Sequence, residues 1–149
     1  VRPGSGALSF MALENFISTV KEFVQGDIYI VFGCTGERDR TKRPIMTNIV
    51  GSYAKYFIIT NDDPHFEDPN QIVADMTKGI QYQNYEVCLD RKKAIEKGIE
   101  RLTKNDVLLI LGKGHEEFMV IGKEKIPFND KKVVLEYLEK HSKEGDEIC

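Results

Sequence analysis

Four cationic side chains lie within the eleven-residue segment 33–43, which follows a short β-branched and aromatic run at 27–32. The segment also carries two glycines, which allow a backbone to approach a ligand closely. Arginine binds carboxylates and phosphates through its planar, forked guanidinium. The residue types therefore leave two interpretations open, a solvated surface loop and a loop that holds an anion.

A sharper alternative comes from the spacing of Cys34 and Arg40, which are separated by five residues. This spacing is typical of cysteine-dependent phosphatases, in which a thiolate attacks phosphorus and the arginine holds the phosphate oxygens. Two carboxylates, Glu37 and Asp39, would however lie inside the anion-binding loop. Pro44 also begins the next helix too late for the helix N-terminus to stabilise a thiolate. These features disfavour a phosphatase, and we expect Cys34 to be a small buried residue at a strand end.

Carboxylates gather in a second polar segment, 61–69, which follows another short strand pattern. Asp62 and Asp63 could simply form a turn before the next proline, or they could hold an amino group, and the residues alone leave both possibilities open. Asp68 is expected to cap the following helix, with Pro69 at its first position.

A third polar segment, 112–117, follows the most apolar strand pattern and presents one lysine, one histidine and two glutamates. It lacks the second histidine of an H-E-x-x-H metal site and the G-x4-G-K-[ST] pattern of a phosphate-binding loop. A glycine-containing loop with charges of both signs remains a candidate for binding a zwitterion.

Hydrophobic periodicity places these segments between alternating strands and helices. Helices are predicted at 13–24, 44–54, 71–80, 91–102 and 130–141, with a frayed tail at 142–149. Strands are predicted at 27–32, 56–60, 86–89 and 106–111, with a hairpin at 118–128. This alternation predicts an α/β fold, a Rossmann-like, doubly wound, mostly parallel sheet of about six strands with helices on both faces. Ligands bind such sheets beyond the carboxyl ends of the strands, so we expect function in the three polar segments.

The composition fits one soluble domain, because 149 residues with 41% hydrophobic content can bury a proper core. The net charge of −3 gives no reason to expect nucleic acid or a membrane surface as a partner. No apolar run reaches the roughly 18 residues of a membrane span. The cysteines, Cys34, Cys88 and Cys149, are odd in number and far apart. They indicate a reducing, cytoplasmic compartment rather than a disulfide framework or a zinc site.

A series of motifs, in order along the chain, resembles the Mur ligases, and most closely the MurE subfamily that adds the third residue of the peptidoglycan peptide. The motifs are ALEN at 12–15, VFGCTGERDRTKRPIM at 31–46, TNDDP at 60–64, EDP at 67–69, DRKKAI at 90–95 and GKGHE at 112–116. They follow the family spacing from about residue 11 to the end. Another Mur-fold ligase, such as a murein-peptide ligase or a polyamino-acid synthetase, is the alternative.

The resemblance implies that 11–149 is the Rossmann-like C-terminal domain of an ATP-dependent ligase. Such an enzyme phosphorylates the D-Glu γ-carboxylate of UDP-MurNAc-L-Ala-D-Glu, and the amino group of a diamino acid then attacks the acyl phosphate to form an amide. The UDP-binding domain and the central ATPase domain, which mainly binds ATP and Mg²⁺, are expected to lie outside this chain. We therefore expect the isolated chain to be inactive, and the enzyme to be a cytoplasmic monomer.

The resemblance also implies roles for particular residues. By motif match, Arg38 would hold the carboxylate of the incoming amino acid, while Gly112 and Glu116 would bind the distal end of its side chain. Three further residues would shape the specificity loop: Asp62, Asp63 and His65. No catalytic or metal-binding residue is expected in the chain, and no residue is assigned to the nucleotide.

Two departures from the family pattern matter. His65 stands where the diaminopimelate-adding enzymes have the arginine of D-N-P-R, and Asp63 replaces the asparagine. Histidine at neutral pH is a weaker, partly charged partner for a carboxylate, so we expect a different diamino acid, such as L-lysine or a diaminopimelate analogue. The family segment D-Y-A-H-x-P should precede Ala12, but SGALSF stands there. Residues 1–10 are accordingly expected to be an altered, tag-like or disordered start.

Overall fold

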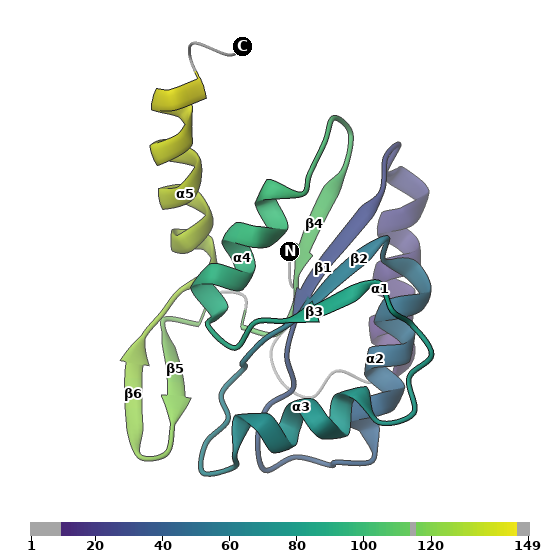
Figure 1. Ribbon diagram of the computed structural model, residues 1–149, viewed down its shortest axis with the longest axis vertical. Helices are drawn as coiled ribbons and strands as arrows, with labels where there is room; N and C mark the ends of the chain where they lie inside the picture. Colours follow the sequence, from purple (N-terminus) through teal and green to yellow (C-terminus); the bar gives the residue numbers. More distant parts are fainter. Residues whose placement is uncertain (1–9, 114–115, 146–149) are drawn as a thin grey trace.

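The computed structural model describes residues 10–113 and 116–145 (Figure 1). All the predicted helices and strands are present, with boundaries that differ by a few residues. In chain order the elements are α1 (Phe10–Phe23), β1 (Ile28–Phe32), α2 (Lys42–Tyr53), β2 (Tyr56–Ile59), α3 (Pro69–Thr77), β3 (Tyr85–Val87), α4 (Arg91–Glu100), β4 (Val107–Ile110), β5 (Phe118–Ile121), β6 (Glu124–Pro127) and α5 (Asp130–Gly145).

The described strands form two sheets rather than one. Four of them make a parallel sheet in the order β3-β2-β1-β4, in which Ile30 of β1 is in register with Phe57 and Leu109. Strands β5 and β6 pair with each other as an antiparallel hairpin that turns at Gly122, and Ile121 of β5 also forms an isolated parallel bridge with His65. A parallel strand needs a crossover connection of a dozen or more residues, usually a helix, whereas only seven residues separate the end of β4 at Ile110 from the start of β5 at Phe118. The predicted six strands therefore divide into a parallel sheet of four and a hairpin.

Both faces of the four-stranded sheet are covered by helices, as predicted (Figure 1). Strand β1 is buried along its whole length, which explains why its sequence is uniformly apolar rather than alternating. Ile30 and Phe32 pack with Leu13 and Ile17 of α1 on one face. Val31 points to the opposite face, where the second core cluster includes residues of α4 and α5. The double covering fixes the strand ends from which the three polar segments emerge.

The helix ends agree with the capping signals in most places. Asp68 accepts a hydrogen bond from the Asn70 amide at 2.9 Å, and Pro69 is the first residue of α3, which confirms the predicted cap. At the chain ends, α1 already includes Phe10, and α5 continues past the predicted end at His141 to Gly145. The rest of the expected altered start, 1–9, and of the expected frayed tail, 146–149, lies outside the described residues.

No helix in the described part of the chain is long and apolar enough to cross a membrane.

Candidate functional site

The three polar segments meet at the carboxyl edge of the parallel sheet and line one cavity of about 380 Å³. Its walls come from the residues that follow β1, β2 and β4, together with side chains of α1 and α2. All the residues proposed for amino-acid recognition lie on this cavity: Arg38, Asp62, Asp63, His65, Gly112 and Glu116. Segments far apart in sequence thus form a single site, at the place where parallel α/β sheets bind ligands.

Close backbone contacts interlock the loops around the cavity. The Gly36 amide donates to the Asp63 carbonyl oxygen at 3.0 Å, and a Cβ at Gly36 would overlap the Pro64 carbonyl. Gly112 has φ of +117°, and a Cβ there would overlap the Asp62 carboxylate. Glycine is therefore required at both positions, at Gly36 by space and at Gly112 by space and by backbone conformation.

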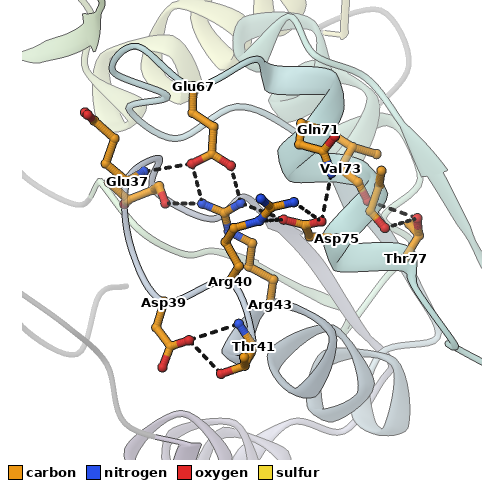
Figure 2. Close-up of polar contacts among 12 residues, drawn as sticks. Glu37, Asp39, Arg40, Thr41, Arg43, Glu67, Gln71, Val73, Asp75 and Thr77 are labelled. Carbon is orange, nitrogen blue, oxygen red and sulfur yellow. Dashed lines mark hydrogen bonds and ion pairs between the residues drawn. The ribbon is translucent and has the colours of Figure 1, made fainter.

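A buried arginine holds the first loop against the second loop and α3 (Figure 2). The side chain of Arg43 is only 2% exposed, and its Nη2 donates to Glu67 Oε1 at 2.9 Å and to the Thr35 carbonyl at 3.3 Å. Glu67 also accepts from the Glu37 amide at 2.9 Å. Hydrogen bonding from Arg43 is the main reason that the pKa of Glu67 is lowered to about 2. Arg43 and Glu67, which the sequence alone did not single out, thus fix the shape of the first loop.

Asp75 of α3 binds two of the arginines of the first loop, Arg40 and Arg43. Arg40 reaches its carboxylate through Nε at 2.7 Å and Nη2 at 3.1 Å, and Arg43 Nη1 lies 3.0 Å from it. Hydrogen bonding from Arg40 is the largest cause of the lowered pKa of Asp75. Arg38, by contrast, is exposed on the cavity and makes no hydrogen bond or ion pair with any described residue. Among the three arginines of the loop, Arg38 is therefore the one whose guanidinium is available to donate hydrogen bonds to a ligand carboxylate.

A buried lysine joins the second and third loops. The side chain of Lys113 is fully buried, and its Nζ lies 2.6 Å from Asp63 Oδ1 and 3.1 Å from Glu116 Oε2. Asp63 Oδ1 also accepts from the Val120 amide at 2.9 Å. Lys113 therefore offsets part of the negative charge on this side of the cavity and sets the distance between the loops. The sequence presented this lysine as one charge among several, because nothing in a single loop shows its partner 50 residues away.

Among the carboxylates that line the cavity, Asp62 is the one that makes no hydrogen bond with a described residue. It is 6% exposed and lines the cavity against Gly112. Burial raises its pKa to about 6, while Arg91 and Lys113 oppose the rise. A buried carboxylate that no described residue satisfies is suited to accept a charged donor from a ligand, such as an ammonium group.

The segment around His65 is held in an uncommon backbone conformation by the hairpin. Asp63 and His65, on either side of Pro64, both have positive φ, of 43° and 55°. The His65 amide donates to the Val120 carbonyl at 3.2 Å, and its carbonyl accepts from the Gly122 amide at 2.6 Å. Non-glycine residues adopt this conformation only where the surroundings hold them, and such residues cluster at ligand sites.

The side chain of His65 faces a glutamate rather than a free anion site. Its Nδ1 lies 3.9 Å from Glu37 Oε2, and it is about one-third exposed. The cavity wall that it shares with Asp62, Asp63 and Glu116 is therefore mainly acidic.

The phosphatase alternative does not fit this geometry. Burial raises the pKa of the Cys34 thiol to about 12, so the thiolate that a phosphatase needs is not formed near neutral pH. Arg40, five residues further on, binds Asp75 instead of facing the sulfur. Cys34 is the small buried residue at a strand end that the sequence suggested.

Comparison with known proteins gives a family match over most of the chain. Residues 5–114 match the family model described as "Mur ligase, glutamate ligase domain". The UDP-N-acetylmuramoyl-L-alanyl-D-glutamate–2,6-diaminopimelate ligase of Bacillus cereus is 46% identical over 125 residues, which cover 84% of this chain and 26% of that protein. The ligase of the same name from Clostridioides difficile is 46% identical over 131 residues, covering 87% and 27%. The chain thus spans about a quarter of the length of these curated relatives.

Solved structures agree with the sequence matches. A structure of a UDP-N-acetylmuramoyl-L-alanyl-D-glutamate–2,6-diaminopimelate ligase superposes with a TM-score of 0.86 at 36% identity, covering 91% of this chain and 28% of that one. A folylpolyglutamate synthase from Thermotoga maritima has a TM-score of 0.53 at 22% identity, covering 72% of this chain and 24% of that one, and shares the fold.

Proposed function

Because this chain belongs to the Mur ligase family, we propose that it is the C-terminal, amino-acid-recognising domain of the ligase that adds a diamino acid to UDP-N-acetylmuramoyl-L-alanyl-D-glutamate. The complete enzyme would form an acyl phosphate on the D-Glu γ-carboxylate with ATP, and the amino group of the diamino acid would displace phosphate to make the amide. It would act as a cytoplasmic monomer, without nucleic acid or a membrane as a partner.

The observation that carries this proposal is the charge distribution around the cavity. Arg38 contributes to one part of the wall a cation that no described residue pairs, whereas Asp62, Asp63 and Glu116 make a second part acidic. An amino acid with a second amino group has a carboxylate for the first wall and an ammonium for the second. We therefore assign the carboxylate of the incoming amino acid to Arg38, and its distal ammonium to the wall formed by Asp62, Gly112 and Glu116.

ATP and Mg²⁺ belong, in this proposal, mainly to the parts of the enzyme outside this chain. Within the described residues, no group of three or more His, Cys, Asp or Glu side chains could hold a metal ion. The sequence also lacks a G-x4-G-K-[ST] phosphate-binding loop. The domain's contribution is to bind and orient the diamino acid, which lowers the entropic cost of bringing its amine to the acyl phosphate.

We infer the identity of the diamino acid from the residue at position 65, His65. The relatives are named for 2,6-diaminopimelate, whose distal carbon carries a carboxylate beside the amine. Among its described residues the acidic wall offers that carboxylate only His65, which already faces Glu37, and Lys113, which is already paired with Asp63 and Glu116. We therefore expect L-lysine, which has the distal amine alone, to be used at least as fast as meso-diaminopimelate.

Amino-acid-dependent phosphate release by the complete ligase tests both parts of the proposal. With UDP-N-acetylmuramoyl-L-alanyl-D-glutamate and ATP present, a diamino acid should stimulate phosphate release and yield the tripeptide product. A lack of ligation with every diamino acid would refute the function. Clearly faster turnover with meso-diaminopimelate than with L-lysine would refute the role given to His65 while leaving the function intact.

The variant His65→Arg provides the matched comparison. Restoring a forked guanidinium should shift the ratio of kcat/KM values toward meso-diaminopimelate by about tenfold, the effect of one charge-assisted hydrogen-bonded pair. Activity with L-lysine should change far less, because lysine has no carboxylate at this end.

A further inference from the structure

Arg91, the first residue of α4, is fully buried beneath the cavity although it does not line it. Its Nη1 donates to the Asn61 carbonyl at 2.8 Å, and its Nη2 donates to the Leu111 carbonyl at 3.2 Å. These two carbonyls follow β2 and β4, which are not neighbours in the sheet because β1 lies between them. One guanidinium therefore joins two strand ends that the sheet itself does not pair.

The residues next in sequence to those two carbonyls carry the recognition site. Asp62 follows Asn61, and Gly112 follows Leu111. The Asp62 carboxylate lies directly against the Gly112 backbone, in space that a Cβ would occupy. A change in the separation of Asn61 and Leu111 would therefore alter the position of Asp62 relative to Gly112.

The guanidinium is held by Asp130, and the segments on its other side are held by their own hydrogen bonds. Asp130, at the start of α5, accepts from Arg91 Nε at 2.7 Å and from Nη2 at 2.8 Å, and it is 5% exposed. On the other side, Asn61 Nδ2 donates to the Leu89 carbonyl at 3.0 Å, and Asp90 caps α4 through the Lys93 amide at 3.2 Å. A forked, doubly bonded guanidinium has little rotational freedom, and lysine could not reproduce this geometry.

We propose that Arg91, locked by Asp130, is a positioning residue that sets the distance between Asp62 and Gly112 and so connects the start of α5 to amino-acid binding. The proposal rests on the function proposed above. It predicts that loosening the Arg91–Asp130 pair weakens binding of the diamino acid specifically, since Arg91 does not line the cavity and its hydrogen bonds go to Asp130 and to the strand ends that position Asp62 and Gly112.

Steady-state kinetics of the complete ligase carrying Arg91→Lys test this role. The KM for the diamino acid should rise by on the order of tenfold or more, the usual consequence of displacing a positioned group. The KM for ATP should stay within about twofold. The control Arg101→Lys makes the same substitution at the end of the same helix. The Arg101 side chain is almost half-exposed, and its ion pair with Glu86 is long, at 3.9 Å. This control should leave both KM values unchanged.

A folded Arg91→Lys enzyme with an unchanged KM for the diamino acid would overturn the proposal. So would a parallel rise in both KM values, because general damage to the fold would affect both substrates. These outcomes are distinct from failure of the proposed function, in which the wild-type enzyme would not ligate any diamino acid.

Two further measurements decide the matter if Arg91→Lys does not fold. Asp130→Asn keeps the side-chain volume and one acceptor oxygen, and it should show the same selective rise in KM. In the wild-type ligase, the diamino acid should slow hydrogen exchange at the start of α5, including the Val133 amide that donates to Asn129. Exchange slowed only in cavity-lining segments would contradict the connection to α5.

Discussion

Replacing Asp62 by asparagine should make the unliganded domain more stable and its binding of the diamino acid weaker. The two effects have opposite signs because the buried carboxylate is unfavourable until a ligand ammonium pairs with it. An ordinary structural residue would lose stability and binding together. The substitution therefore separates a side chain that recognises a ligand from one that supports the fold.

The stability effect follows from the pKa of Asp62, which burial raises from 3.8 to about 6. An acid with a raised pKa binds its proton more tightly in the folded state, so protonation favours folding below about pH 4. That contribution is lost as the pH rises through 6. Two pKa units correspond to roughly 3 kcal/mol, so asparagine should add on the order of 1–3 kcal/mol to the free energy of unfolding at pH 7.5. The gain should shrink as the pH falls toward 4.

The binding effect has the reverse dependence on pH, because only the ionised carboxylate attracts an ammonium group. At pH 5 about a tenth of Asp62 is ionised if its pKa is about 6, so affinity for the diamino acid should fall by about tenfold between pH 7.5 and 5. The Asp62→Asn variant should not show this fall in affinity between pH 7.5 and 5, and at pH 7.5 it should bind the diamino acid on the order of tenfold more weakly than the wild type.

Urea denaturation of the chain at both pH values, and the KM for the diamino acid in the complete ligase, provide the assays. The neighbouring variant Asp63→Asn is the control, since Asp63 is paired with Lys113 and its loss should reduce stability. A lower urea midpoint for Asp62→Asn at pH 7.5, or an unaltered KM, would refute the reasoning.

Further predictions concern the loop scaffold. Arg43→Met should lower the free energy of unfolding, measured by urea denaturation, by about 3 kcal/mol, because it leaves Glu67 and Asp75 without their buried partner. The matched variant Arg40→Met should have little effect, because the Arg40 side chain is exposed. Gly112→Ala should cost about 1–3 kcal/mol of stability in the same assay and raise the KM for the diamino acid, since it adds a Cβ at positive φ against Asp62. Cys34, whose pKa is raised to about 12, should be alkylated by iodoacetamide at pH 8 only after the protein is unfolded, as detected by mass spectrometry. Rapid alkylation of the native protein at Cys34 would contradict the burial of its thiol.

The parts of this site that could be predicted from sequence are those encoded within single segments. The apolar runs predict β1, β2 and β4, and because ligand sites form at the carboxyl edge of such a sheet, they also predict that the segments of Arg38, Asp62 and Gly112 lie together. The division of the strands into two sheets could not be predicted from the sequence, because the periodicity of a strand does not show which strands pair with each other.

The buried cations could not be predicted, for a different physical reason. Arg43, Arg91 and Lys113 look like ordinary surface charges in sequence, since such side chains are rarely buried unless they are paired. Their partners Glu67, Asp130 and Asp63 lie 24, 39 and 50 residues away. Only the packed fold brings each pair together, so a charge in one loop gave no sign of its structural role.

The interlock between Gly36 and Pro64 also bears on any effort to re-engineer substrate choice. The 62–65 turn fits only against a glycine at 36, and its Asp63 fits only opposite Lys113. Grafting this turn alone into a protein without the matching glycine and lysine would thus place the Asp63 carboxylate without its counter-charge and the Pro64 carbonyl against a side chain. The smallest transplantable unit is therefore the set of three loops together, whereas a single exchange such as His65→Arg changes a side chain within loops that already fit one another.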